Sequence, residues 1–372
     1  MNEQFNENAR RSRLAMFHID GPLLLGLLAL MGFGLTILYS ASGQNIAMME
    51  AQLVRLGVAL AVMTAIAQVK PQTLKRWSLP LFLAGLALLV AVLLVGHVGK
   101  GAQRWLDLGF MKFQPSEVMK LAVPMAVAWF ISSHSLPPRL WHLLVGFMMC
   151  AIPTLLIAKQ PDLGTSILIA AAGVFVLFMS GMSWRIIAFV AAVISAFLPV
   201  LWLFLMHDYQ RQRVLTFLNP ESDPLGSGYH IIQSKIAIGS GGLEGKGYLQ
   251  GTQSQLEFLP ERHTDFIFAV ISEEIGLLGV LVLLSLYLFI IGRCMFIASQ
   301  AQDNYSKLVA GSFTLTFFVY VFVNIGMVSG LLPVVGVPLP LISYGGTSMV
   351  TLLAAFGVIM SVGTHKRILA AP

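Results

Sequence analysis

Ten apolar runs, each about 20 residues long, limit what this chain can fold into, because that length matches the hydrocarbon core of a bilayer. With 57% hydrophobic and 11% charged residues among 372, the chain has too little polar surface for a water-soluble fold. Backbone groups in lipid must be hydrogen-bonded internally, and the runs lack the alternation of a membrane β-barrel, so they are predicted to be helices. The runs lie near residues 22–40, 51–68, 78–97, 116–132, 142–158, 164–181, 185–206, 266–292, 308–331 and 346–362.

The predicted fold is therefore an all-α polytopic membrane protein with ten transmembrane helices. A long polar loop, 207–265, separates the seventh run from the eighth. The whole chain, 1–372, is interpreted as one integral membrane domain with a polar tail at 1–20. The first run exceeds the core of about 7–15 residues found in cleaved signals, so we expect a retained helix. Cys150 and Cys294 fall in or beside apolar runs far apart in the chain, which predicts neither a disulfide nor a metal site.

The distribution of lysine and arginine predicts the orientation. With the N-terminus inside, the inner segments carry 12 of these residues and the short outer loops carry 4. Because cytoplasmic loops are enriched in Lys and Arg, both termini are predicted to be cytoplasmic and 207–265 to face outward. The formal net charge of +6 reflects this bias more than any nucleic-acid site.

The loop 207–265 is a polar island, with 12 of the 40 charged residues and 8 glycines. It ends at Asp265, after which the sequence turns apolar. A carboxylate at the mouth of a membrane helix, behind a loop whose glycines free the backbone to approach a ligand, indicates chemistry at the membrane surface. The loop is not a phosphate-binding P-loop, because no Gly-Lys-Ser/Thr follows a strand.

Glu117 and Lys120 stand three residues apart at the outer end of the fourth run. On a helix they share a face and can form an ion pair, which a charge within the bilayer is expected to need. Two interpretations stay open at this point. The pair either stabilises the helix bundle, or Lys120 faces a cavity and meets an anionic substrate.

Other charged residues are weaker candidates. If Asp265 begins the eighth helix, Glu273 and Glu274 follow about 12–14 Å along it and point in different directions, so they are not expected to face one groove together. Arg104, Arg211 and Arg213 lie at the outer face. Arginines there can hold phosphates through paired hydrogen bonds, or they can be solvated anchors at the interface.

An irregular segment precedes the last apolar run. Prolines and glycines between Asn324 and Ser348 break the helix and permit a sharp re-entry. Backbone of this kind at membrane depth must be buried in protein or line a wet cavity.

These residues resemble the signature of the SEDS family (shape, elongation, division and sporulation). The likeness covers nearly the whole chain, and the stretches 207–213 and 257–262 resemble the elongation branch of the family more than the division branch. The matching motifs are Asn324-x5-Gly330-Leu331, Leu341-Ile342-Ser343-Tyr344-Gly345-Gly346-Thr347-Ser348, Gly228-Tyr229-His230-Ile231-Ile232-Gln233-Ser234, Arg262-His263-Thr264-Asp265, Gln114-Pro115-Ser116-Glu117 and Gln160-Pro161-Asp162-Leu163-Gly164-Thr165.

The resemblance implies a ten-helix enzyme of the bacterial inner membrane, a peptidoglycan glycosyltransferase that polymerises lipid II into β-1,4 glycan strands. It implies that Asp265 is the catalytic aspartate and that Glu117 and Lys120 form the family's transmembrane pair. Its expected partners are a class B penicillin-binding protein transpeptidase, other membrane proteins of the elongation complex and membrane lipid, but no nucleic acid.

The expected mechanism is inverting, with Asp265 as general base. Lys120, Arg104, Arg213 or a divalent cation, magnesium or manganese, could neutralise the leaving diphosphate, and the sequence does not choose among them. Two other functions remain open. A lipid II flippase would use the same groove and intramembrane charges, and a scaffold of the elongation complex would have no use for Asp265.

Overall fold

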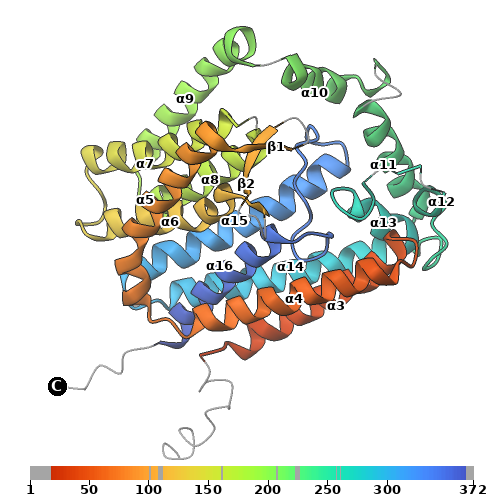
Figure 1. Ribbon diagram of the computed structural model, residues 1–372, viewed down its shortest axis with the longest axis horizontal. Coiled ribbons are helices and arrows are strands. Elements are labelled where there is room, and N and C mark those ends of the chain that lie inside the picture. Colours follow the sequence, from red (N-terminus) through yellow and green to blue (C-terminus); the bar gives the residue numbers. More distant parts are fainter. Residues whose placement is uncertain are drawn as a thin grey trace, which may run out of the picture.

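The computed structural model describes residues 18–99, 102–107, 112–160, 162–206, 208–222, 227–256, 258–259 and 261–365. Over these residues the chain is mostly helical, and the helices form one bundle whose long members run side by side (Figure 1). The first three are α3 (Gly21–Ala41), α4 (Ile46–Ala67) and α5 (Pro71–Val95). After a short stretch of strands come α6 (Pro115–Ser132) and α7 (Leu140–Ala158).

The remaining long helices are α8 (Leu163–Met179), α9 (Trp184–Val200), α14 (Gly276–Ser299), α15 (Asn304–Val328) and α16 (Thr347–Thr364). A π-helical turn, η1 (Leu201–Leu205), continues α9. Short polar side chains start several helices by accepting a hydrogen bond from a free N–H of the first turn. Asp20 does so for α3, Asn45 for α4, Asp162 for α8 and Asp303 for α15.

Among the residues that the structure describes, eight helices are long and apolar enough to cross a membrane by length and composition. The predicted runs at 116–132 and 164–181 coincide with α6 and α8, but neither is among the eight, and α8 has only 17 residues. The count of ten spans therefore stays a prediction. The division into one membrane domain also stays a prediction, and most of the tail 1–20 lies outside the described residues.

Among the candidate spans, the last two helices are the most deeply buried. In α15 and α16, 67% and 61% of the most apolar window is buried, whereas in the span from Trp184 to Phe204 the buried share is 0%. In Figure 1, α9 leans away from the other helices, and α10 (Asp208–Leu218) continues on that side. The helices α15 and α16 are thus held by protein on most faces, while α9 presents its apolar side chains outward.

The loop 207–265 contains helical structure. After α10 come a 3-10 turn, η2 (Pro220–Ser222), then α11 (Ser227–Gly241) and the single turn α12 (Thr252–Gln255). The helix α11 packs against α13 (Ile267–Glu274) and α15, so this part of the loop is docked on the bundle.

The prediction of an all-α fold fails between the third and fourth runs. There β1 (His97–Gly99), β2 (Ala102–Asp107) and β3 (Lys112–Phe113) form an antiparallel sheet in the order β1-β2-β3. Aromatic residues among polar ones favour a pleated, half-buried surface, so this stretch suits short strands. The prediction of an all-α fold did not take that preference into account.

The prediction of one eighth helix over 266–292 is also wrong. The chain forms the short helix α13, turns at Gly276 with φ +69°, and only then begins α14. A side chain at Gly276 would strike the backbone of Leu243, Glu244 and Gly245, so the sharp turn depends on glycine there. Asp265 consequently lies before a short buried helix and not at the mouth of a membrane helix.

Candidate functional site

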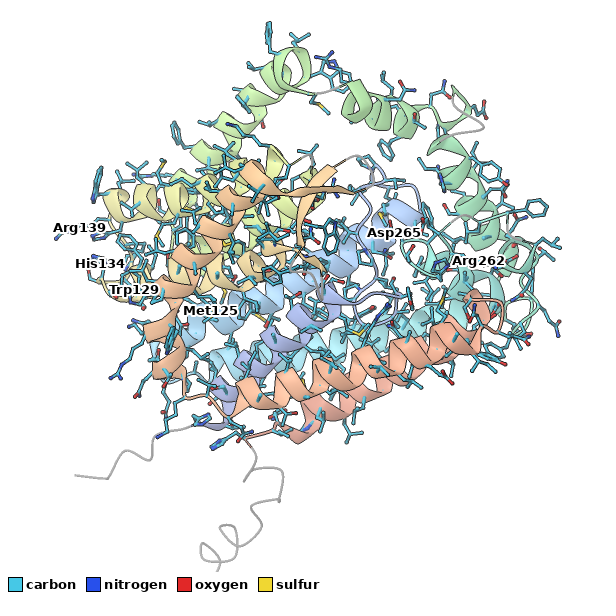
Figure 2. The ribbon with its side chains drawn as sticks, in the orientation of Figure 1. Met125, Trp129, His134, Arg139, Arg262 and Asp265 are labelled. Atoms are coloured by element: carbon cyan, nitrogen blue, oxygen red, sulfur yellow. The ribbon has the colours of Figure 1, made fainter. Side chains whose placement is uncertain are left out.

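Asp265 lies in a turn over residues 261–266, which we call the carboxylate turn. Figure 2 shows Asp265 and Arg262 in the right half of the view and His134 and Arg139 at its left edge. Three consecutive carbonyls of the turn accept hydrogen bonds from α15 and from the segment between α15 and α16. The pairs are Tyr344 N to His263 O at 2.8 Å, Ser343 Oγ to Thr264 O, and Asn324 Nδ2 to Asp265 O at 2.9 Å.

The irregular segment 329–346 passes directly beside the carboxylate. Gly336 has φ +77°, and a Cβ added to it would lie 3.5 Å from Oδ2 of Asp265. The prediction that this backbone is buried in protein or lines a cavity is confirmed for Leu339, Leu341 and Ile342, all less than 5% exposed. The segment therefore forms one wall around the carboxyl group of Asp265.

The N-terminal side of the turn is tied to other elements. Arg262 donates from Nε to the carbonyl of Ala41 at 2.8 Å, and its Nη1 bonds the carbonyl of Ser254. Phe266 is buried and stacks on the ring of His230 from α11, with centroids 5.7 Å apart. Burial lowers the pKa of His230, against a smaller opposing effect of the Glu261 carboxylate. A neutral imidazole is thus favoured next to the turn.

The predicted pair of Glu117 and Lys120 is confirmed in the structure. Lys120 Nζ lies 2.7 Å from Glu117 Oε1, and the two side chains are 13% and 9% exposed. The other carboxylate oxygen of Glu117 accepts a hydrogen bond from Thr351 of α16 at 2.7 Å. Lys120 Nζ also lies 5.5 Å from the ring centroid of Tyr320 on α15. The pair therefore joins three helices, α6, α15 and α16.

A small cavity adjoins this pair. It has a volume of about 30 Å³ and is bounded by Lys120, Thr316, Tyr320, Thr351 and apolar side chains, among them Phe313 and Phe356. The space is close to that of one or two water molecules. The cavity agrees with the interpretation that Lys120 faces a cavity, but its size excludes a sugar or a diphosphate in this conformation.

Of the predicted arginines, Arg104 has an acidic partner. Its Nη1 lies 3.7 Å from Asp162 Oδ2 and its Nε donates to the carbonyl of Gln160 at 3.3 Å. Its side chain is 34% exposed. Arg211 donates to the carbonyls of Trp202 and Leu203, which fixes α10 to η1. The side chain of Arg213 lies outside the described residues.

Glu273 and Glu274 differ most from the expectation. Both are buried, and both reach the segment 251–255. Glu273 accepts from the N–H groups of Gln253 and Ser254 and from Lys246 Nζ, and Glu274 accepts from Ser40 Oγ at 2.6 Å. The predicted divergence assumed a helix that starts at Asp265. Instead the loop folds over α13, so both carboxylates hold 207–265 to that helix through hydrogen bonds.

Burial by itself raises the pKa of Glu273, which lies in α13 outside the candidate spans. The N–H of Gln253, the Lys246 ammonium and the N–H of Ser254 outweigh that effect and hold the pKa below its ordinary value. Glu273 is thus ionised and fully engaged at neutral pH, which makes it a poor proton acceptor.

Sequence reasoning missed the role of two residues in particular. Asn324 and His230 appear within the quoted motifs, but nothing in the sequence shows that they touch the carboxylate turn. The only local signal for Asn324 is an amide side chain within a run of apolar residues near the end of a membrane helix.

Among the described residues, no three His, Cys, Asp or Glu side chains gather as metal ligands. Mg²⁺ is usually held by one or two carboxylates together with substrate phosphates, which does not require such a cluster. The magnesium or manganese expectation stays a prediction.

Comparison with known proteins gives a consistent result. A family model for FtsW, RodA and SpoVE, described as "Cell cycle protein", matches residues 20–368. The chain is 57% identical over 352 residues to the peptidoglycan glycosyltransferase MrdB of Escherichia coli, covering 95% of both chains. It is 37% identical to a probable peptidoglycan glycosyltransferase FtsW of Trichlorobacter lovleyi, covering 96% of this chain and 95% of that protein.

Solved structures agree. A chain from a peptidoglycan synthase complex, described as coordinating polymerisation and crosslinking, superimposes with a TM-score of 0.81 at 33% identity, covering 93% of this chain and 97% of that one. The rod shape determining protein RodA of Thermus thermophilus gives a TM-score of 0.70 at 28% identity, with 93% and 96% coverage.

Proposed function

The chain belongs to the family of FtsW, RodA and SpoVE cell cycle proteins, and from that premise we propose how it works as a peptidoglycan glycosyltransferase. Identity to MrdB is 57%, against 37% to an FtsW protein, which supports membership of the elongation branch. The substrate is lipid II, a disaccharide on a diphosphate carried by a polyprenyl chain. The product is a β-1,4 glycan strand.

Asp265 is the general base. It takes the proton from the 4-hydroxyl of the acceptor sugar while that oxygen bonds to the anomeric carbon of the donor. The bond from that carbon to the diphosphate breaks, and the polyprenyl diphosphate leaves. An α-linked donor thus gives a β-1,4 bond by inversion. The observation that carries this assignment is the carboxylate turn: three successive carbonyls are held by hydrogen bonds, which fixes the backbone that bears Asp265.

The departing diphosphate carries negative charge that a nearby cation must stabilise. The structure favours Arg104 over Lys120 for this contact. Arg104 keeps about a third of its side chain exposed and sits 3.7 Å from Asp162, whereas Lys120 is 13% exposed and tightly bound to Glu117. A lone charge in the bundle is costly, so the Glu117–Lys120 pair serves to hold α6 against α15 and α16. Arg213 remains a further candidate.

The proposed topology is ten spans with both termini cytoplasmic and 207–265 at the outer face. The ends of the bundle support it. Arg139 lies at the same end as the described chain termini, and Asp265 lies toward the opposite end (Figures 1 and 2).

Cysteine labelling tests the orientation. Glu244→Cys, exposed in the long loop, should react with an impermeant thiol reagent in intact spheroplasts, and Arg139→Cys, also exposed, should react only after lysis. Both native cysteines are buried and give little background. The reverse pattern would place the carboxylate turn in the cytoplasm, away from any site where glycan strands are made, and would refute the catalytic proposal.

The expected partner is a class B penicillin-binding protein transpeptidase, together with other membrane proteins of the elongation complex. The support is the structural neighbour, whose complex coordinates polymerisation with crosslinking. The test of the activity is a polymerisation assay. The purified chain with its transpeptidase is given lipid II, and glycan length is read on a gel for the wild type and for Asp265→Asn. A flippase or a scaffold would show no dependence of polymerisation on that carboxylate.

Gly336→Ala is expected to reduce polymerisation roughly tenfold, equivalent to about 1.4 kcal/mol in the barrier. At φ +77° an alanine is strained, and its methyl group would lie beside Asp265 Oδ2. The matched control is Gly292→Ala in α14, where an added Cβ meets nothing within 4 Å. Equal rates for the two variants would show that 329–346 does not shape the site.

A further inference from the structure

The carboxylate turn is held by donors from α15 and from the segment that precedes α16. The donors to His263 O, Thr264 O and Asp265 O come from Tyr344, Ser343 and Asn324. One donor is a backbone N–H, which any residue except proline supplies. The other two are side chains, Asn324 on α15 and Ser343 in the segment before α16, and their identity therefore matters.

Asn324 is completely buried, at 0% exposure. Its Nδ2 donates to Asp265 O at 2.9 Å and to Val337 O at 2.7 Å. The amide thus ties the carboxylate turn to the segment that carries Gly336. Both hydrogens of the NH₂ group are in use, so neither aspartate nor serine could replace it fully.

The same side chain breaks a rule of protein interiors. Its Oδ1 is buried and has no hydrogen-bond partner among the described residues. An unsatisfied buried acceptor is destabilising, and an apolar side chain of similar shape would avoid that penalty. Stability alone therefore does not explain an asparagine at this position. Local violations of this kind are expected where function sets the requirement.

Ser343 complements Asn324. It is 3% exposed, its Oγ donates to Thr264 O, and the same oxygen accepts the N–H of Leu339 at 2.8 Å. The hydroxyl thus joins the carboxylate turn to the loop that leads into α16. With Asn324, it fixes two adjacent peptide units, one on each side of the Asp265 Cα.

The helix α15 also connects the turn to the intramembrane pair. Tyr320 precedes Asn324 by four residues, about 6 Å along the helix and on the same face. Its ring lies under Lys120 Nζ. One rigid, largely buried helix thus carries both the residue that holds the Asp265 backbone and the residue next to Lys120.

We propose that Asn324 and Ser343 are positioning residues for Asp265, holding the peptide units on either side of it so that its carboxylate meets the acceptor hydroxyl. The inference rests on the proposed role of Asp265 as general base. Misplacing a catalytic group by about 1 Å can reduce a rate about a hundredfold without changing how substrate binds. The expected signature is therefore a loss in kcat with KM preserved.

The test uses the full chain with its transpeptidase and lipid II. Asn324→Leu removes both donors and the unpaired oxygen while keeping the volume, and Ser343→Ala removes the second side-chain tie. Each should lower kcat about 10- to 100-fold and leave the KM for lipid II within about twofold. The control is Ser312→Ala, also at 0% exposure in α15, whose Oγ bonds Ala172 O at 2.6 Å far from the turn. It should lower Tm and leave kcat unchanged.

A second measurement separates positioning from support of the fold. Placed in the Asp265→Asn background, Asn324→Leu should cause no further loss of the residual rate, because its effect acts through the missing carboxylate. A folded Asn324→Leu protein with wild-type kcat, or a further loss in that background, would overturn the proposal. If Asn324→Leu does not fold, Ser343→Ala decides by the same criteria. If Asp265→Asn alone keeps the wild-type rate, the general-base assignment fails instead, whatever the Asn324 variants do.

Discussion

Asp265→Asn is expected to lower the rate of lipid II polymerisation about 10²–10⁴-fold, roughly 3–5 kcal/mol in the barrier, the usual effect of losing a general base. Asparagine keeps the size of the side chain but cannot accept the proton of the acceptor hydroxyl. The protein should insert, fold and bind its transpeptidase normally, because Asn324 holds the backbone carbonyl of Asp265 and this bond survives the substitution. The measurement is glycan yield against time at saturating lipid II.

Asp303→Asn is the matched control. Asp303 caps α15 by accepting the N–H of Ser306 at 3.0 Å, and asparagine caps a helix equally well. The same chemical change there should leave both the rate and Tm close to wild type. A folded Asp265→Asn protein that polymerises at the wild-type rate would refute the general-base role.

If Asp265 is not the general base, the structure limits which other carboxylate could take that role. Asp162 is next to Arg104 and caps α8, and Glu273 is buried and bound by Lys246 and two backbone N–H groups. Glu261 is exposed and lies in the carboxylate turn itself, so it would be the next candidate. The flippase interpretation would also have to be reconsidered.

The membrane helices were predictable because apolar length is a local property. Each predicted run overlaps a helix, and the pair of Glu117 and Lys120 follows from a spacing of three residues on one helix. The position of Asp265 before an apolar stretch was likewise visible in the sequence. These features need no knowledge of what packs against them.

The break at Gly276 and the fate of Glu273 and Glu274 could not be predicted, because both depend on a distant segment. Gly276 turns where the backbone of Gly245 lies against it. The carboxylates accept hydrogen bonds from residues about 20 positions earlier in the chain and from Ser40. Hydropathy over 266–292 reports that the residues are apolar, which is equally true of a buried short helix and of a membrane span.

Arg104 illustrates the limit for charged residues. The sequence shows an arginine near the outer face, but its partner Asp162 is 58 positions away, and only the fold brings them within 3.7 Å. The family motif containing Asp162 gave no indication of this pairing. Arg104, which was predicted to bind phosphate, thus also holds the sheet against the start of α8.

Lys120→Met is expected to destabilise the protein by about 3–5 kcal/mol, the usual effect of removing one partner of a buried ion pair. Methionine keeps most of the volume but leaves the Glu117 carboxylate with only Thr351, at 9% exposure. The loss should appear as a lower Tm in detergent and as reduced polymerisation. The matched double variant, Glu117→Gln with Lys120→Met, removes both charges and should recover most of the stability, because no uncompensated charge remains.

The double variant decides what the pair does. Recovery of Tm without recovery of polymerisation would show that the charges act on the substrate or on how α15 holds the carboxylate turn. Recovery of both would reduce the pair to a structural clamp between α6, α15 and α16, and the location of Lys120 next to a cavity of about 30 Å³ would then be incidental. We expect the first outcome. The hydrogen bonds that hold the carboxylate turn come from Asn324, Ser343 and Tyr344 and not from the pair, yet α15 links the two through Tyr320 and Asn324.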